Sequence, residues 1–465
     1  MKRHLIILLL LFLALSAVGE TEVPDAFIYR GGSGRVTLTC PDYRLEDSEA
    51  FAHICFDSPN YTRILVNGTE YATQQEGKSS FAEIPVLLNR SFDIQATTTA
   101  MSQPHDITYT LYIGVDALSD GNLPGLRKLS VTVPRYAKGF AVDEYEDGYA
   151  LIRITEGQRF LVVPEGMPVP EGLHPDIRVL QLPLQKVYLA ATSVMSLVSA
   201  VHALDRIAFS SIRAEDWEIP AAKMAMEQGQ IRFAGKYDTP DYELLVREGC
   251  DLAIESTMIG HSPKIMEMLE LLGIPVWVDR SSYEPHPLGR TEWIRLYGIL
   301  FGKREEADRF FEEQANRIQE LPDPSGNRGT VAFFYLNANG AVVVRNPSDY
   351  IPEMIRMAGG SYVPEAAPTG MTAASVNISM ENFYAEACEA DYLIYNAAID
   401  QPLSSVSDLI SRNPLFASFK AVQNGHVYCA QRRMYQATDT VSDFILDVRH
   451  MFEGSEEMTF LTPVR

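Results

Sequence analysis

Short runs of alternating apolar and polar residues fill the first quarter of the chain. A two-residue period is that of a β-strand with one buried face, and turn clusters such as Asp57–Asn60 separate the runs. Short strands at this spacing predict a small all-β sandwich over residues 26–117. The runs that carry this prediction are Arg35–Cys40, Ala52–Phe56, Arg63–Val66, Ser91–Thr97 and Asp106–Ile113.

The pattern changes after a linker of small and polar residues at 118–128. Two hairpins are predicted first, with turns at Asp147-Gly148 and Glu156-Gly157. Apolar runs then alternate with helical stretches, which predicts an α/β layer with a mainly parallel sheet. Two helices at 286–321, divided at Gly302, interrupt the series before it begins again. We therefore predict an α/β fold with two Rossmann-like lobes, 130–285 and 322–465, joined by a long helix.

Two segments far apart in the chain share one pattern. Pro240–Glu255 and Ser379–Tyr395 each contain an acid at a helix start, then a cysteine and an aspartate, then a short apolar strand. The acids are Glu243 and Glu381. A repeated helix-strand unit supports two similar lobes and predicts a binding protein that docks symmetrically on a two-fold partner.

Composition excludes several classes of function. Apolar content of 46% and charged content of 22% are those of a folded globular protein. A net charge of −22 argues against nucleic acid, because phosphate binding needs clustered lysine and arginine. Five cysteines do not make a disulfide framework, although Cys40 and Cys55 share one segment and could pair. We find no zinc spacing, P-loop or nucleophile elbow, so we predict no enzyme, no catalytic residue, no metal site and no cofactor.

The N-terminus predicts export. Lys2 and Arg3 precede the apolar run Leu5–Val18, and Ala17 and Gly19 are small residues at positions −3 and −1 of a cleavage site. This pattern is typical of a signal peptide at residues 1–19. No cysteine lies near the cut, so the lipid-anchor signal of many exported binding proteins is not seen. The sequence leaves open a periplasmic protein, a released one, or one kept at the membrane by an uncleaved signal.

Several blocks between residues 130 and 460 resemble one family. In their sequence and order they are similar to substrate-binding proteins of iron-complex ABC importers, a class that includes haem- and vitamin B12-binding members. The resemblance implies an extracytoplasmic monomer that binds its ligand between two lobes. It also implies that Glu243 and Glu381 form salt bridges with arginines of the membrane permease. The blocks are Tyr136–Phe140, Ala191–Val194, Gly235–Glu243, Glu284–Trp293, Ser379–Glu381 and Ala421–Tyr428.

The resemblance also implies a cleft lined by loops at strand ends. We expect a ferric siderophore there, in preference to haem, with vitamin B12 third. Since many such chelates are anionic, cleft arginines would form a local positive well. The predicted ligand-binding residues of the first lobe are Thr192, Ser193, Tyr237, Ser256, Thr257 and Tyr283, and those of the second are Tyr335, Asn337, Arg345, Arg432 and Arg433.

Haem would need an axial tyrosine, histidine or methionine. His261, His286 and Tyr237 are candidates, although His286 lies between two prolines and is better explained as a rigid corner before a helix. The β-domain loosely resembles bacterial haem-binding (NEAT) sandwiches, with Met101, His105 and Tyr109 as candidate ligands, but we favour a structural role for these three residues. A spacer or wall-adhesion domain, and hence a released scavenger or adhesin, is the alternative.

Overall fold

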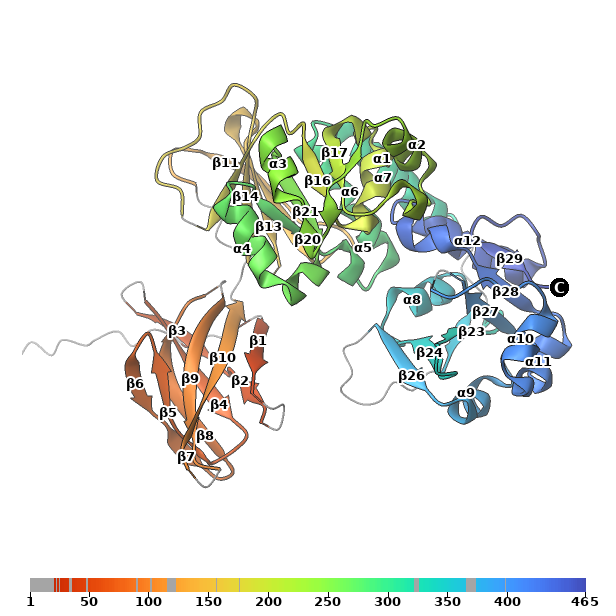
Figure 1. The fold of residues 1–465 in the computed structure, drawn as a ribbon, viewed down its shortest axis with the longest axis horizontal. Helices are drawn as coiled ribbons and strands as arrows, with labels where there is room; N and C mark the ends of the chain where they lie inside the picture. The colour runs from red at the N-terminus through yellow and green to blue at the C-terminus, as the bar shows by residue number, and fades with distance from the viewer. Residues whose placement is uncertain are drawn as a thin grey trace, which may run out of the picture. The chain divides into compact units, whose positions relative to one another are not determined.

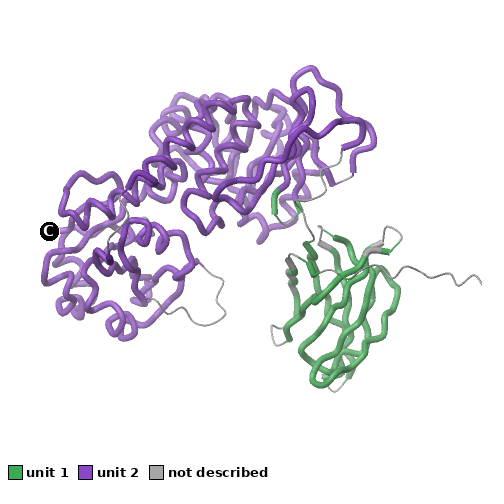
Figure 2. Tube along the Cα trace, turned by 180° about the vertical axis from the view of Figure 1, so that it is seen from behind, with its two compact units in different colours: residues 1–121, 154–157 green, residues 122–153, 158–465 purple. Residues whose placement is uncertain are grey.

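The computed structural model describes thirteen stretches of the chain, which divide between two compact units. One unit comprises residues 1–121 with 154–157 and the other residues 122–153 with 158–465 (Figure 2). The predicted signal segment and Met101 lie outside the described residues. These residues are 21, 23–24, 26–32, 36–46, 49–88, 91–100, 103–114, 123–155, 157–174, 176–321, 326–364, 374–397 and 399–465.

The first unit is the predicted all-β sandwich. Its two sheets are antiparallel throughout, with strand orders β2-β4-β8-β7 (β3 also pairs with β4) and β1-β10-β9-β5-β6. Alternation is clear in β8, where every second residue is buried. The strands are β1 (Ala26–Gly31), β2 (Leu38–Thr39), β3 (Tyr43–Glu46), β4 (Glu49–Phe56), β5 (Tyr61–Val66), β6 (Thr69–Ala72), β7 (Gln74–Glu76), β8 (Ser79–Val86), β9 (Ser91–Thr98) and β10 (His105–Gly114).

Tyr109 belongs to the core of this sandwich. Its ring is 2% exposed, and its hydroxyl lies 2.6 Å from that of Tyr61, which stacks on Phe56 at 4.0 Å between ring centroids. His105, by contrast, is exposed at the start of β10. Tyr109 is therefore engaged in packing rather than free to bind haem, as the favoured structural explanation expected.

Cys40, directly after β2, and Cys55, in the neighbouring strand β4, face opposite sides of their sheet. Cys40 follows β2 and is buried, whereas Cys55 lies between two buried residues of β4, Ile54 and Phe56, and is itself partly exposed. All five cysteines are free thiols. Pairing of Cys40 with Cys55 is therefore not observed, because alternate residues of a strand point to opposite faces.

Two sheets form the first lobe of the second unit (Figure 1). One has the order β11-β12-β13-β14-β15 and contains the two predicted hairpins. The other is parallel, with the order β18-β17-β16-β21-β22. The strands are β11 (Lys128–Thr132), β12 (Phe140–Tyr145), β13 (Ala150–Ile154), β14 (Gln158–Val163), β15 (Ile177–Gln181), β16 (Val187–Leu189), β17 (Ile207–Ser210), β18 (Arg232–Phe233), β21 (Leu252–Ser256) and β22 (Val276–Asp279), with a separate small hairpin of β19 (Gly235–Lys236) and β20 (Thr239–Pro240).

The parallel sheet has the doubly wound order in which the chain runs outward from a central pair, β16 and β21. Helices α3 and α4 cover one face of it, where Leu245 and Leu269 pack with Tyr188 and Ala253. In such sheets, the loops at the carboxyl ends of the central pair form a crevice. The helices of this lobe are α1 (Thr192–Ala200), α2 (Pro220–Glu227), α3 (Tyr242–Glu248) and α4 (Pro263–Leu271).

Three consecutive helices link the lobes: α5 (Pro287–Glu292), α6 (Ile294–Leu300) and α7 (Arg304–Gln319). Gly302 separates α6 from α7 with a positive φ of 67°, as its position predicts. One end of α7 is paired with the first lobe through Arg304 and Glu144 at 2.6 Å, and the other end with the second lobe through Arg317 and Asp443 at 2.5 Å. The predicted bridging helix is confirmed.

The second lobe is α/β but its sheet is mixed. Its order is β26-β24-β23-β27-β28-β29, with β25 also beside β23. Only β23, β25, β27 and β28 run parallel to one another, and the chain ends in a strand that the sequence analysis missed. The elements are β23 (Thr330–Leu336), β24 (Val342–Arg345), α8 (Tyr350–Met357), β25 (Ser361–Val363), β26 (Ser375–Ile378), α9 (Met380–Ala387), β27 (Tyr392–Asn396), α10 (Val406–Arg412), α11 (Lys420–Gln423), β28 (Val427–Ala430), α12 (Val441–Glu453) and β29 (Leu461–Pro463).

Candidate ligand-binding cleft

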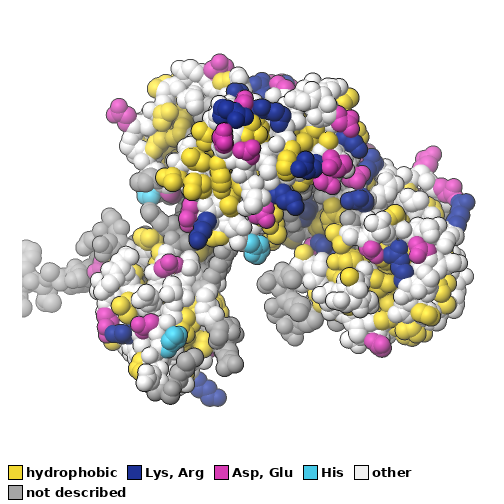
Figure 3. Space-filling model, in the orientation of Figure 1, with side chains coloured by type: hydrophobic (Ala, Val, Ile, Leu, Met, Phe, Trp, Pro, Cys, Tyr) yellow, Lys and Arg dark blue, Asp and Glu magenta, His cyan; other side chains and the backbone are white. Residues whose placement is uncertain are grey.

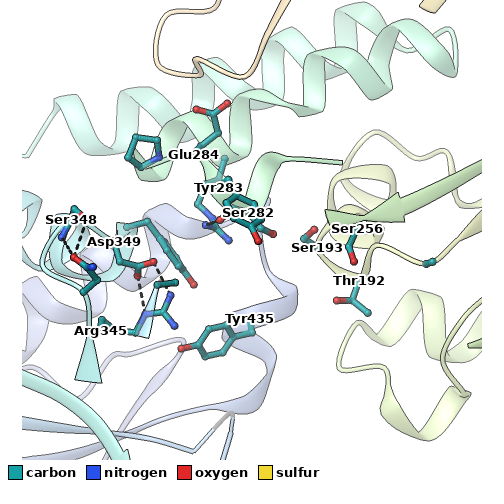
Figure 4. Close-up of a pocket in the computed structure, with 16 residues that line it drawn as sticks. Thr192, Ser193, Ser256, Ser282, Tyr283, Glu284, Arg345, Ser348, Asp349 and Tyr435 are labelled. Atoms are coloured by element: carbon teal, nitrogen blue, oxygen red, sulfur yellow. Dashed lines mark hydrogen bonds and ion pairs between the residues drawn. The ribbon is translucent and has the colours of Figure 1, made fainter. Parts of the chain in front are cut away.

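A cleft of about 710 Å³ lies between the two lobes of the second unit (Figure 4). The first lobe contributes residues that follow β16, the last residue of β21, at the crevice of the doubly wound sheet, and the loop after β22. The second lobe contributes the segment from the end of β24 to the start of α8, and Tyr435. A volume of this size suits a small organic ligand or metal chelate. The lining residues are Ala190, Thr192, Ser193, Ser256, Ser282, Tyr283, Glu284, Pro285, Arg290, Arg345, Asn346, Ser348, Asp349, Tyr350, Ala374 and Tyr435.

Five of the eleven predicted ligand-binding residues line this cleft. Four come from the first lobe, because they lie at the ends of its central strands or in the loop after β22, and the fifth comes from the end of β24. They are Thr192, Ser193, Ser256, Tyr283 and Arg345.

The first-lobe side is rich in hydroxyl groups (Figure 4). Ser193 lies behind the carboxyl end of β16, where its Oγ is 3.4 Å from Asp279 Oδ1. Asp279 is buried and accepts hydrogen bonds from Ser281 Oγ and from Tyr297 OH, both at 2.6 Å. Burial raises the pKa of Asp279, while these hydrogen bonds oppose the shift. Asp279 thus fixes the floor of the cleft without lining it.

On the second-lobe side, Arg345 is held in a closed pair. Its Nε and Nη2 donate to the two carboxylate oxygens of Asp349 at 2.9 and 2.7 Å, and its Nη1 donates to Ser375 Oγ at 3.0 Å (Figure 4). All three guanidinium nitrogens therefore have partners within the lobe. The charge of Arg345 is therefore balanced by Asp349. The sequence did not predict this pair, because an aspartate directly before a helix is usually explained as the helix cap.

Arg290 is the cleft arginine that the sequence analysis missed. It lies on α5, is 8% exposed, and stacks on the ring of Tyr350 from the second lobe at 3.7 Å. Its Nη1 donates to the carbonyl oxygen of Ser282 at 2.6 Å. It forms no ion pair with an acid in the described parts of the chain. Its position in the recognised block Glu284–Trp293 was the available signal.

Glu284 has a structural role at the edge of the cleft. Its carboxylate accepts hydrogen bonds from the backbone N–H groups of Lys138 and Gly139, both at 2.8 Å, and from Trp293 Nε1 at 2.9 Å. These bonds tie the loop before β12 to the loop before α5. Glu284 is 4% exposed, so it contributes a fixed negative charge beside the ligand space.

The expected positive well is not formed. Arg345 is neutralised by Asp349, and Arg432 and Arg433 do not line the cleft. Arg432 is exposed and lies 3.9 Å from Glu218, and Arg433 lies over the ring of Phe460 at 4.9 Å. Both arginines lie in the 3-10 turn Arg432–Gln436 after β28, from which Tyr435 alone among the described residues of that turn lines the cleft.

Four further predicted residues also lie elsewhere. Tyr237 packs into the core beneath α3, and Thr257 begins the short 3-10 turn after β21. Tyr335 packs into the core of the second lobe, and Asn337 closes the β23–β24 turn by accepting N–H groups of Asn339 and Ala341. Tyr335 and Asn337 lie at the carboxyl end of β23, whereas Arg345 ends the antiparallel strand β24 at the opposite edge of that sheet. Thr257 directly follows the lining residue Ser256 but does not line the cleft itself.

The histidine candidates for haem ligation are likewise outside the cleft lining. His261 is exposed in the turn after β21. His286 stacks on Tyr136 at 4.6 Å, and its Nδ1 accepts the N–H of Leu288. Burial lowers the pKa of His286. His286 therefore forms the expected structural corner before α5.

An amide clamp fixes the wall of the cleft across the two lobes. Gln436, in the 3-10 turn Arg432–Gln436, accepts the N–H of Glu218 and donates to the carbonyl of Asp216, both at 2.9 Å. The preceding residue, Tyr435, lines the cleft and accepts a hydrogen bond from Asn396 Nδ2 at 3.0 Å. The contact between lobes therefore also positions a ligand-facing ring.

The two acids of the repeated unit occupy the same position in their helices. Glu243 is the second residue of α3 and Glu381 the second residue of α9, and both side chains are exposed. The cap of α3 is Asp241, which accepts the N–H of Leu244 at 2.9 Å. A carboxylate at this position is favoured by the helix dipole.

The cap of α9 is Ser379, whose hydroxyl accepts the N–H of Asn382 at 3.2 Å. Hydrogen bonds from its own backbone N–H and from Ser379 lower the pKa of Glu381. Glu243 has only a long contact, 3.7 Å, with Arg247. Both carboxylates are thus exposed at the first turn of their helices.

Comparison with known proteins assigns the fold. Residues 216–433 match the family model described as periplasmic binding protein. The match covers a little under half of the chain, and over this segment the chain is similar to periplasmic binding proteins, as the sequence blocks predicted. The segment contains Glu243, Glu381 and the cleft residues Arg345 and Asp349, whereas Tyr435, Thr192 and Ser193 lie outside it.

Two curated relatives of this chain are uncharacterized lipoproteins of Methanocaldococcus jannaschii. One is 25% identical over 377 residues, covering 73% of this chain and 87% of the relative. The other is 22% identical over 356 residues, covering 73% of this chain and 88% of the relative.

Solved structures with partial similarity include a periplasmic binding protein of Veillonella parvula, with 15% identity and a TM-score of 0.49, covering 62% of this chain and 97% of that one. A periplasmic haem-binding protein of Vibrio cholerae has 16% identity and a TM-score of 0.46, covering 57% and 98%. An Fe³⁺-hydroxamate transport protein of Saccharomonospora viridis has 16% identity and a TM-score of 0.44, covering 59% and 94%.

Proposed function

We propose that this protein is an extracytoplasmic receptor that captures an iron complex and delivers it to an ABC permease. The observation that carries the proposal is the cleft, which both lobes of a periplasmic binding protein domain line with polar side chains. Lobes joined by the packed helix α7 and clamped by Gln436 can hold a ligand between them. Binding, rather than catalysis, is the function of such a domain.

A ferric siderophore is the ligand that the cleft chemistry favours. Hydroxyl groups and tyrosines face the space, and no histidine or methionine lines its described part. Haem normally takes such a residue, or a tyrosine, as its axial ligand. Tyr283, Tyr350 and Tyr435 line the cleft and are the tyrosines that haem would need as an axial ligand, so haem is the second candidate.

Glu243 and Glu381 are the proposed contacts with the permease. Each begins a helix of its lobe at the same position, and a carboxylate there can take a bidentate arginine. Two equivalent acids on two similar lobes suit a permease with two-fold symmetry. Each lobe would then contribute one acid, and each acid would contact an equivalent arginine of the permease.

We propose the outer face of the membrane as the site of action. The relatives named lipoproteins suit this location, although Cys40, the first cysteine of the chain, is buried in the β-sandwich and does not suit lipid attachment. Among the described residues, no helix is sufficiently long and apolar to cross a bilayer.

Uptake of a ⁵⁵Fe-labelled ferric trihydroxamate by cells with the cognate permease tests the proposal. The double variant Glu243→Ala with Glu381→Ala is expected to lose most uptake while the purified protein keeps its affinity for the chelate. The matched control, Glu267→Ala with Glu386→Ala, removes two exposed acids from α4 and α9 and is expected to transport normally. Unchanged uptake by the first pair would refute the docking assignment.

A further inference from the structure

Arg290 is the single cation of the described cleft lining that has no acidic partner. We propose that Arg290 is the anion-binding residue of the cleft, and that the cleft selects iron chelates that are neutral or carry one negative charge over triply anionic ones. The inference rests on the proposed function and specifies the charge of its ligand.

The charges lining the described part of the cleft cancel. Arg290 and Arg345 contribute two positive charges, and Glu284 and Asp349 contribute two negative charges. The described lining therefore carries no net charge.

Three of these four groups are already engaged within the protein. Arg345 is paired with both oxygens of Asp349, and Glu284 accepts three hydrogen bonds from the polypeptide. Asp279, behind the cleft, is held by Ser281 and Tyr297; it interacts electrostatically with Arg290 but forms no ion pair with it. Arg290 alone keeps guanidinium N–H groups without an acid to receive them.

The Arg290 guanidinium is also held in place before a ligand arrives. The Tyr350 ring supports its face at 3.7 Å, and the Ser282 carbonyl fixes Nη1 at 2.6 Å. Stacking on an aromatic ring stabilises a cation without neutralising it. A rigid, charged donor in a half-enclosed space matches one carboxylate, because little side-chain entropy is lost on binding.

A triply anionic chelate would meet unfavourable charges in the same space. One of its charges could pair with Arg290, whereas the others would be desolvated near the fixed carboxylates of Glu284 and Asp349. The remaining lining donors are neutral hydroxyls, including those of Thr192, Ser193 and Ser256. Neutral hydroxyls suit the carbonyl oxygens of hydroxamate and amide groups.

Three ferric chelates of different charge test this inference in the full-length protein. N-acetyl ferrioxamine B is neutral, N-succinyl ferrioxamine B carries one negative charge, and ferric enterobactin carries three. Tryptophan quenching should give the succinyl compound the tightest binding, about tenfold to hundredfold tighter than the acetyl compound, with enterobactin weakest.

Arg290→Gln should remove the preference for the succinyl compound and leave acetyl binding within about twofold. Arg290→Lys should keep part of the preference, and Arg433→Gln, outside the cleft, should keep all of it. A succinyl preference that survives in Arg290→Gln, or enterobactin binding tightest to the unaltered protein, would overturn the inference.

The proposed function and this inference fail differently. If no ferric chelate binds, the proposal that the protein captures iron complexes is wrong, and the proposed charge preference is wrong as well. If chelates bind and affinity rises with negative charge, only the role of Arg290 is wrong. The comparison of the three chelates needs no variant, so it stands even where Arg290→Gln does not fold.

Discussion

Asp251 and Asp391 accept equivalent backbone hydrogen bonds in the two lobes. Asp251 directly precedes β21 and accepts the N–H groups of Gln185 and Lys186, both at 2.8 Å, just before the neighbouring strand β16. Asp391 directly precedes β27 and accepts the N–H of Thr330 at 2.9 Å, at the start of the neighbouring strand β23. The repeated pattern in the sequence therefore reflects a repeated device that fixes the start of two adjacent parallel strands.

Replacing either aspartate by alanine should leave backbone donors without their acceptor and lower the free energy of unfolding by about 1–3 kcal/mol. Asp391→Ala should cost more than Asp251→Ala, because Lys420 also pairs with Asp391 at 2.7 Å. Urea denaturation of the purified variants measures both. Losses below about 0.5 kcal/mol would show that these contacts are incidental.

Asp349→Asn removes the charge that balances Arg345. Because the two side chains are 10% and 14% exposed, the loss of the ion pair should lower the free energy of unfolding by about 1–3 kcal/mol. The same change frees a positive charge in the cleft, so affinity for ferric enterobactin should rise about tenfold. Calorimetry and fluorescence titration check the two effects separately, and a fall in enterobactin affinity would contradict the charge account.

Glu255 predicts a pH dependence of stability. It lies on β21, is fully buried, and neither carboxylate oxygen has a hydrogen-bond partner in the described structure. Burial raises its pKa from 4.5 to about 8. The folded state thus holds a proton that the unfolded state has released, so stability is greatest below pH 4.5 for this group and falls as pH rises toward 8, by at most about 1.4 kcal/mol per pH unit.

The variant Glu255→Gln removes this titration while keeping the shape of the side chain. The difference in unfolding free energy between variant and unaltered protein should move in favour of the variant from pH 5 to pH 8. Other acids with raised pKa values, such as Asp447, titrate in both proteins and cancel in the difference. A difference that does not change with pH would place Glu255 in contact with water.

The pattern of the sequence predicted the architecture well, for identifiable reasons. Alternation in β8, the periodicity of α7 and the positive φ of Gly302 are local properties that neighbouring residues determine. The mixed second sheet was harder, because the pairing of β29 with β28 joins residues that are far apart in the chain. Strand direction is set by that long-range pairing, which periodicity does not record.

The cleft was only half predictable. Ser193 and Ser256 follow the central strands, so their meeting follows from the sheet order. Arg290 was missed because a helix that links two lobes offers no sign of which side chain turns inward. Arg432 was predicted to bind the ligand because of its charge, yet it is exposed, lies 3.9 Å from Glu218 and does not line the cleft. Side-chain direction in loops depends on tertiary contacts such as the Gln436 clamp.

On the displayed face of the second unit, acidic and basic side chains are interspersed (Figure 3). This face offers no broad positive field to attract an anionic chelate, and the net charge of −22 on the chain would repel one. Association of an anionic ferric chelate should therefore not slow when the salt concentration rises from 20 to 200 mM in stopped-flow quenching. A steep decline would instead indicate long-range attraction.

The most direct test of the central claim is titration of the purified protein with a ferric trihydroxamate, followed by tryptophan quenching and visible absorption, beside the cleft variant Ser256→Phe. Capture of an iron chelate between the lobes predicts saturable one-to-one quenching with the charge-transfer band of the bound chelate, and at least tenfold weaker binding by the variant. A Soret band in the protein as purified would contradict the siderophore assignment, and equal binding by Ser256→Phe would place the ligand outside the cleft.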